Sequence, residues 1–127
     1  MAVHKKILVV EDDPDIRECL QDALEMIGYA SIAACNGQEA LEMLEHCELL
    51  PCLILLDLMM PVMNGHQFCA LKKENPKLAK IPVVVVSADG NLAHKTAGLD
   101  VNDLINKPVD FAALIQLTRK YCGPGAA

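Results

Sequence analysis

The stretch Lys6-Ile-Leu-Val-Val-Glu-Asp-Asp-Pro14 decides the fold class of this chain, because an apolar run passes directly into a cluster of acids and a proline. Residues 7–10 show no alternation of apolar and polar side chains, which is typical of a strand covered on both faces in a parallel sheet. Asp13 and Pro14 suit the capping position and the first position of a helix. The stretch therefore predicts a buried strand followed at once by a helix.

Short apolar runs and helical patterns alternate along the rest of the chain. Strands are expected at residues 7–10, 30–34, 53–56, 83–86 and 103–106. Helices are expected from Pro14 to near Gly28, after an Asn36–Glu39 capping box, from near Gly65 to Glu74, around residues 92–98, and from Asp110. Five strand–helix units predict an α/β fold, with helices on both faces of one doubly wound parallel sheet.

Composition and charge limit the classes of function. A chain of 127 residues with 53% hydrophobic residues can form one core, and its net charge of −6 argues against a nucleic-acid-binding surface. The six cysteines form no CxxC pair and the histidines have no metal-binding spacing, so we expect reduced structural thiols and no zinc site. The first residues lead directly into a strand pattern, and no apolar run is long enough to span a bilayer. A cytoplasmic protein is therefore expected.

Chemically active side chains follow four of the expected strands. Glu11 and Asp12 follow the first apolar run, Asp57 the third, Ser87 the fourth and Lys107 the fifth. The carboxyl ends of parallel strands share one edge of a sheet, where ligands bind in open α/β folds. Each residue alone has a structural explanation, as a loop cap, a helix cap or a solvated charge. Such explanations do not account for all of them meeting at one edge.

Three neighbouring carboxylates resist ionising together unless a cation offsets their repulsion. Mg²⁺ suits this site because it takes oxygen ligands and commonly bridges to phosphate, whereas calcium is disfavoured because the chain has no EF-hand loop. A carboxylate can act as a nucleophile and form an aspartyl phosphate. Lys107, Ser87 and the metal could then supply the positive charge and the positioning that phosphoryl transfer needs.

Four segments resemble the receiver domains of two-component response regulators: Lys6-Ile-Leu-Val-Val-Glu-Asp-Asp-Pro14, Leu55-Leu-Asp-Leu-Met-Met-Pro-Val-Met-Asn-Gly65, Ser87-Ala88 and Lys107-Pro108. This resemblance covers essentially the whole chain. It implies a receiver domain over residues 1–122 and a short C-terminal tail at 123–127. It also implies a five-stranded parallel sheet in the order 2-1-3-4-5, the flavodoxin-like (CheY-like) three-layer sandwich.

The resemblance also implies a role for each residue of the site. Asp57 matches the phosphoacceptor of the family, Asp12 a direct Mg²⁺ ligand, and Glu11 a ligand that acts largely through water. Met59 occupies the position whose backbone carbonyl is the third protein ligand. Lys107 is expected to pair with the phosphoryl oxygens.

A second group of positions is expected to form the switch. Ser87 matches the hydroxyl that turns toward the phosphoryl group, and Ala88 the small residue that leaves it room. Leu104 stands where the family usually has Tyr or Phe, so the coupling between hydroxyl and aromatic ring is expected to be weaker or differently built. The bond between Lys107 and Pro108 is expected to be cis.

These roles imply phosphorelay signalling, in which a histidine kinase or a histidine phosphotransfer protein donates a phosphoryl group to Asp57. Phosphorylation would shift an existing equilibrium between inactive and active forms. The face made by the fourth helix, the fifth strand and the fifth helix would then control a downstream protein partner. We expect a monomer or weak dimer that catalyses only its own phosphorylation and dephosphorylation and does not contact nucleic acid or membrane directly.

Other interpretations stay open. The chain is either a stand-alone receiver or a receiver fragment of a larger hybrid kinase or regulator. A phosphorylation-independent protein-binding module is a further alternative. An aspartyl-nucleophile phosphatase or mutase is disfavoured, because such enzymes typically have a second Asp two residues after the nucleophile, where this chain has Met59.

Overall fold

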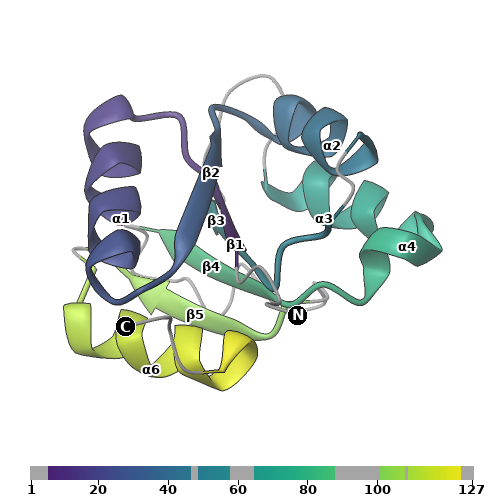
Figure 1. Ribbon diagram of the computed structural model, residues 1–127. Helices are drawn as coiled ribbons and strands as arrows, with labels where there is room; N and C mark the ends of the chain where they lie inside the picture. The colour runs from purple at the N-terminus through teal and green to yellow at the C-terminus, as the bar shows by residue number, and fades with distance from the viewer. Residues whose placement is uncertain (1–5, 47–48, 58–64, 88–100, 108, 124–127) are drawn as a thin grey trace.

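The computed structural model describes residues 6–46, 49–57, 65–87, 101–107 and 109–123. Within these ranges, five parallel strands form one sheet in the order β2-β1-β3-β4-β5 (Figure 1), which confirms the expected topology. The strands are β1 (Lys6–Val10), β2 (Ala30–Ala34), β3 (Leu53–Asp57), β4 (Val83–Ser87) and β5 (Asp103–Asn106).

Helices cover both faces of the sheet, as expected for a doubly wound fold. The described helices are α1 (Pro14–Met26), α2 (Gly37–Glu45), α3 (Gly65–Glu74), α4 (Pro76–Ala79) and α6 (Phe111–Cys122). Figure 1 shows α1 and α6 on one face of the sheet and α2, α3 and α4 on the other. None of the helices in the described part of the chain has the length and apolar character needed to cross a bilayer.

The central strands are buried on both faces, as the continuous apolar runs predict. Every second residue of β1, β3 and β4 packs toward α1 and α6: Ile7, Val9, Leu53, Leu55, Val84 and Val86. The residues between them pack toward α2, α3 and α4: Leu8, Val10, Ile54, Leu56, Val83 and Val85. All of these side chains are at most 2% exposed. Each contributes about 1.5–3 kcal/mol of hydrophobic stabilisation. Because they are buried on both faces, they hold the central strands, and so the residues at the strand ends, in place.

The first helix begins and ends where the sequence predicts. The Asp13 carboxylate accepts hydrogen bonds from the backbone N–H groups of Asp15 (2.9 Å) and Ile16 (3.4 Å), and Pro14 takes the first helical position. Gly28 follows the helix with a φ of 93°, a left-handed conformation that favours glycine. The helix therefore starts two residues after Asp12 and holds the acidic turn in place.

One capping contact and one helix differ from the expected ones, although α2 starts after Asn36 as predicted. Asn36 accepts a hydrogen bond from the Glu39 N–H (2.8 Å), but the Glu39 carboxylate returns to the N–H of Cys35 (3.2 Å) and not to that of Asn36. The return hydrogen bond of the expected capping box is therefore made to the residue before the N-cap, Cys35. The short helix α4 was not predicted, because Asn75-Pro76 indicates a helix end. Asn75 also caps a new helix, since its side chain accepts from the Lys77 N–H at 3.0 Å.

Two further boundary predictions have different outcomes. The last helix begins at Phe111, with Asp110 as its cap and not its first residue. The expected helix around residues 92–98 lies outside the described residues.

The expectation that all cysteines are reduced is wrong for one pair. Cys52, just before β3, forms a disulfide with Cys122, the last residue of α6, with a Cα–Cα distance of 5.4 Å. These cysteines are 70 residues apart in the sequence, and only the folded topology brings them within bonding range. Among the other described cysteines, Cys19, Cys35 and Cys69 take no part in a disulfide.

A hydrogen bond and an ion pair connect the last turn of α6 to Asp103 at the start of β5. The Tyr121 hydroxyl donates a hydrogen bond to Asp103 Oδ2 (2.6 Å), and Lys120 Nζ lies 3.1 Å from the same oxygen. The Tyr121 hydroxyl, with help from Lys120, lowers the pKa of Asp103 below its usual value. The ionised carboxylate therefore stabilises the docked helix.

Replacing Tyr121 by Phe should lower the free energy of unfolding by about 1 kcal/mol at pH 7, because a hydrogen bond to a charged but partly exposed acceptor is lost. Because the pKa of Asp103 is lower in the folded state, its contribution is complete above the usual aspartate pKa and is lost as the pH falls through the folded pKa. Urea unfolding should thus show a difference that shrinks below about pH 4. Tyr121→Phe in an Asp103→Ala background is the control. A difference that persists at low pH, or in that background, would contradict the assignment.

Candidate functional site

The candidate site lies at the edge of the sheet where the parallel strands end. Glu11 directly follows β1, Asp57 is the last residue of β3, and Lys107 directly follows β5. Ser87 ends β4 and pairs with Asn106 in the parallel register, so its backbone reaches the same edge. The common direction of the strands therefore gathers these residues, as the sequence predicts.

Three carboxylates are crowded at this edge. Oxygen atoms of Glu11, Asp12 and Asp57 all lie within 4.8 Å of one another. Glu11 is only 2% exposed and Asp57 only 6%, whereas Asp12 is exposed. Water screens the repulsion among such groups poorly when they are buried, so the cluster requires a cation nearby.

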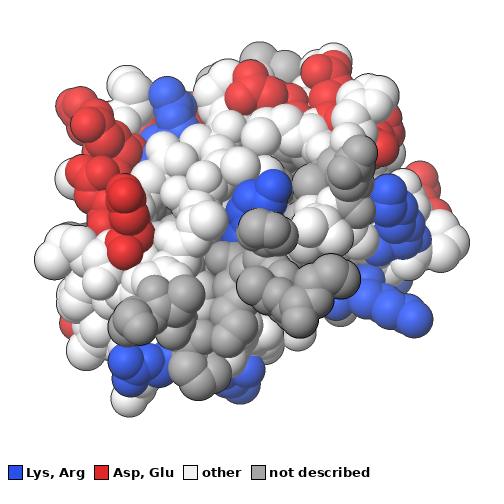
Figure 2. All heavy atoms as spheres, viewed as in Figure 1, with Lys and Arg blue, Asp and Glu red and all other residues white. Residues whose placement is uncertain are grey.

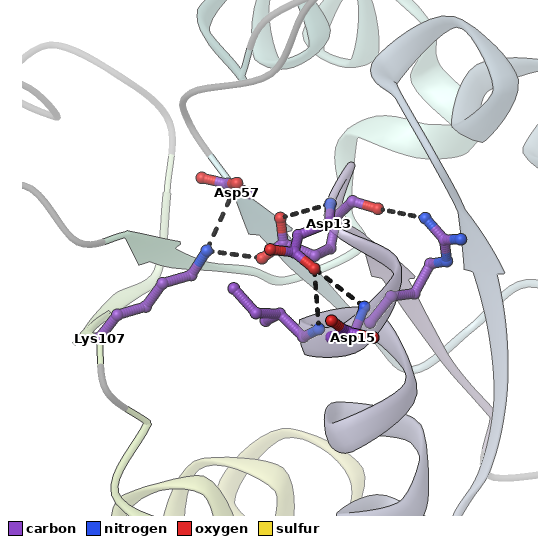
Figure 3. Close-up of polar contacts among 7 residues, drawn as sticks. Asp13, Asp15, Asp57 and Lys107 are labelled. Atoms are coloured by element: carbon purple, nitrogen blue, oxygen red, sulfur yellow. Dashed lines mark hydrogen bonds and ion pairs between the residues drawn. The ribbon is translucent and has the colours of Figure 1, made fainter.

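Lys107 supplies positive charge to the cluster. Its side chain extends from the end of β5 toward Asp57 and the turn after β1 (Figure 3). The Nζ atom lies 2.6 Å from Glu11 Oε1 and 3.5 Å from Asp57 Oδ2, and the Lys107 side chain is 15% exposed. The shorter pair is with Glu11, so the ammonium group is placed between the two buried carboxylates and bonded mainly to one of them.

Backbone and helix contacts hold Glu11 in position. The N–H of Asp13 donates to Glu11 Oε2 (3.3 Å), and the Arg17 guanidinium donates to the backbone carbonyl of Glu11 (2.9 Å). The Glu11 N–H donates to the Ala34 carbonyl at the end of β2 (3.1 Å). The role of Arg17 was not predicted, since an arginine in the first turns of a helix has no spacing that indicates its partner.

The electrostatic environment shifts the pKa values of three groups. Burial, reinforced by the Asp57 carboxylate, raises the pKa of Glu11, although Lys107 acts in the opposite direction. Desolvation and the neighbouring Glu11 raise the pKa of Asp12. Burial acts to lower the pKa of Lys107, but pairing with Glu11 and Asp57 outweighs it and the pKa is raised. Glu11 and Asp12 thus resist ionisation, and the ammonium group of Lys107 is kept charged.

The donor set fits a hard divalent cation. All the candidate side-chain ligands are carboxylate oxygens, which Mg²⁺ prefers. The exposure of Asp12 leaves an open side to the cluster, and Mg²⁺ usually retains several water molecules. The same open side is where a phosphoryl group could approach Asp57.

Comparison with known proteins assigns the chain to one family. A family model for the response regulator receiver domain matches residues 7–119. The chain belongs to the response regulator receiver domain family. The region matched by the family model includes all four residues of the acidic and basic cluster.

Similar proteins differ in length from this receiver domain. A probable transcriptional regulator, ycf27, of Cyanophora paradoxa is 41% identical over 108 residues, which cover 82% of this chain but 42% of that protein. An uncharacterized 14.6 kDa protein of Leptolyngbya boryana is 39% identical over 118 residues, which cover 91% of this chain and 88% of that protein. This receiver domain thus spans less than half of one curated relative and most of another.

A solved receiver structure is also similar. The signal receiver domain of a signal transduction histidine kinase from Syntrophus aciditrophicus is 32% identical, with a TM-score of 0.83. The match covers 93% of this chain and 89% of that chain. Receiver domains of this fold therefore occur within histidine kinases as well as regulators.

The structure brings together four of the side chains predicted for the site: Glu11, Asp12, Asp57 and Lys107. Their chemical roles stay predictions. Met59, Ala88 and Pro108 lie outside the described residues, as does the side chain of Ser87. The carbonyl ligand, the switch hydroxyl and the cis bond therefore also stay predictions. Leu104 is partly buried and packs against the core beneath α2, α3 and α4.

Replacing Asp12 by Asn should stabilise the metal-free receiver domain. The neutral amide removes one member of a repelling carboxylate cluster, so the free energy of unfolding should rise by up to about 1 kcal/mol at low salt. The gain should shrink in concentrated salt, which screens exposed charges. Chemical unfolding in the presence of a chelator measures the effect. Glu74→Gln, which neutralises an exposed carboxylate on α3, is the matched control. An equal gain in this control, or a loss in Asp12→Asn, would argue against charge repulsion at the site.

Proposed function

We propose that this receiver domain accepts a phosphoryl group on Asp57 from a phosphohistidine of a histidine kinase or histidine phosphotransfer protein. The observation that carries the proposal is the position of Asp57. Its carboxylate is 6% exposed at the end of β3, lies in a cluster with Glu11 and Asp12, and has the Lys107 ammonium 3.5 Å away. A nucleophilic carboxylate thus stands among groups that can hold a metal and a phosphoryl oxygen.

In the proposed reaction, an Asp57 oxygen attacks phosphorus as the phosphorus–nitrogen bond of the donor breaks. The imidazole leaves with the electron pair of that bond, and an aspartyl phosphate remains. Glu11, Asp12, Asp57 and the Met59 carbonyl would hold Mg²⁺, which when bound would offset the negative charge of the phosphoryl oxygens.

Lys107 has a separate part in this reaction. Its ammonium group is already 3.5 Å from Asp57 Oδ2, so it needs only a small movement away from Glu11 to bond the incoming phosphoryl oxygens. Water in the same site would later release phosphate. Beyond catalysing these two reactions on itself, the chain is proposed to have no enzymatic activity.

The donor is proposed to dock over α1 and the start of α6. A cavity of about 390 Å³ lies there, next to the phosphorylation site, and Lys107 forms part of its lining. Most of the lining is apolar and includes Ile16, Leu20, Val109 and Phe111, and Phe111 is 44% exposed. Figure 2 shows acidic side chains in a stripe over α1, where the exposed acids are Asp15, Glu18, Asp22 and Glu25. An apolar helix flanked by basic residues would complement this surface.

The signal is proposed to leave through β5 and α6, after Ser87 turns toward the phosphoryl group into the space that Ala88 leaves. Leu104 lies on β5 and packs against the core. A leucine occupies less volume than the usual aromatic residue, so its response is proposed to be a smaller repacking.

Support for a regulatory output comes from the transcriptional regulators among the relatives. DNA contact in such a system would come from another domain, because this chain is acidic. We place the receiver domain in the cytoplasm, as a monomer or weak dimer.

Incubation with acetyl phosphate and Mg²⁺ should add one phosphoryl group to the protein, as measured by intact mass. The increment should disappear when Mg²⁺ is chelated and in Asp57→Asn, which removes the nucleophile. Asp22→Asn, which changes an exposed acid on the same protein, is the matched control and should be phosphorylated normally. Absence of the increment in the folded wild-type protein would leave a phosphorylation-independent binding module as the better account.

A further inference from the structure

The disulfide between Cys52 and Cys122 joins two elements that also carry the functional site. Cys52 directly precedes β3, whose other end is Asp57, and Cys122 ends α6, which follows Lys107 in the chain. Both cysteines are partly exposed and pack against the core beneath α1 and α6. The bond therefore lies at the far end of the sheet from the carboxylate cluster and within reach of solvent.

The two halves of α6 are held in different ways. Leu114 in the first half is 1% exposed within the core, and that half needs no covalent link to stay docked. The second half also packs on the core through Leu117 and Thr118. Its last turn is held in addition by Tyr121 and Lys120 contacting Asp103, by the Tyr29 hydroxyl donating to the Gly123 carbonyl, and by the disulfide. Losing the covalent bond should therefore loosen the end of the helix first.

We propose that Cys52 and Cys122 form a reversible thiol–disulfide exchange site, which takes a dithiol reductant and thereby sets how firmly the end of α6 is anchored. A reductant thiolate attacks one sulfur, forms a mixed disulfide and releases the other cysteine as a thiolate. The second thiol of the reductant then displaces the remaining cysteine. The products are two protein thiols and a cyclic disulfide of the reductant, with two electrons transferred to the protein.

The reduced form is accommodated without rearrangement of the core. Cys52 Sγ lies 3.5 Å from the Lys6 carbonyl oxygen. In the disulfide this sulfur has no hydrogen to donate, whereas the reduced thiol can donate a weak hydrogen bond to that oxygen. Both cysteines also keep their apolar contacts, since a free thiol packs as a small hydrophobic group. Both redox states are therefore compatible with the fold.

The setting favours exchange over a permanent structural bond. In a reducing compartment, disulfides of ordinary proteins are usually transient and are used for catalysis or redox sensing. This bond also fastens a surface helix and not an interior one, because α6 has exposed residues along its outer side. The inference rests on the proposed cytoplasmic location, but it goes beyond phosphorylation of Asp57 and does not depend on it.

Hydrogen exchange of the full chain, oxidised and after treatment with dithiothreitol, tests the proposal. Reduction should accelerate amide exchange in residues 117–123 by about tenfold or more, and in the reduced protein these amides should be less protected than those near Leu114. The thermal midpoint should fall by about 10 °C or more, since a long closed loop is released. Reoxidation with oxidised glutathione should reverse both changes.

Two variants separate the proposed site from general effects of the reductant. Cys52→Ala/Cys122→Ala should resemble the reduced protein and should not respond to dithiothreitol. Cys19→Ala, which removes an exposed thiol outside the bond, should respond like the wild type. Equal exchange in the two redox states, a response that persists in the double variant, or free thiols at both positions in the protein purified without reductant would each overturn the proposal. Intact-mass phosphorylation of the same samples reports on Asp57 separately, so failure of one proposal is distinguishable from failure of the other.

Discussion

The ammonium group of Lys107 among buried carboxylates is the interaction on which the site depends. Glu11 and Asp57 are nearly covered by protein, and the end of the parallel sheet gives them no freedom to separate. Without a cation, their mutual repulsion would oppose folding at the edge where β1 and β3 end. Lys107 limits this cost through a 2.6 Å contact with Glu11 and a longer contact with Asp57. The same arrangement leaves one acid, Asp12, exposed, and that acid gives a metal ion and a phosphoryl group an approach.

The fold itself was predictable because its determinants are local or periodic. The uniform apolar runs of β1, β3 and β4 indicate strands buried on both faces, and alternate side chains do pack on opposite sides. The cap at Asp13 and the glycine at position 28 bound α1 by local chemistry. Helix α4 was missed because the same Asn75-Pro76 pair that ends α3 also starts a new turn. The same two residues therefore mark both the end of α3 and the start of α4, and the sequence pattern alone indicates only the end.

The meeting of Glu11, Asp12, Asp57 and Lys107 was predictable, but the detail of their contacts was less so. Parallel strands must end at a common edge, so residues at the carboxyl ends of β1, β3 and β5 had to meet. The preference of Lys107 for Glu11 over Asp57 depends on side-chain packing and could not be read from spacing. The Cys52–Cys122 bond depends on how α6 lies along the sheet. Neither cysteine has a neighbour in the sequence that indicates its partner, so only the tertiary structure identifies the pair.

The most direct test of the account is the affinity of the site for Mg²⁺, measured by calorimetric titration of the wild type and two variants. Asp12→Asn removes a ligand, whereas Lys107→Met removes the cation that competes for the same carboxylates. We expect one Mg²⁺ per chain in the wild type, weaker binding in Asp12→Asn and tighter binding in Lys107→Met. Each change should be about tenfold, which corresponds to about 1.4 kcal/mol. Equal affinity in all three proteins, or no Mg²⁺ binding in the wild type, would contradict a site in which Lys107 and the metal offset the same negative charge.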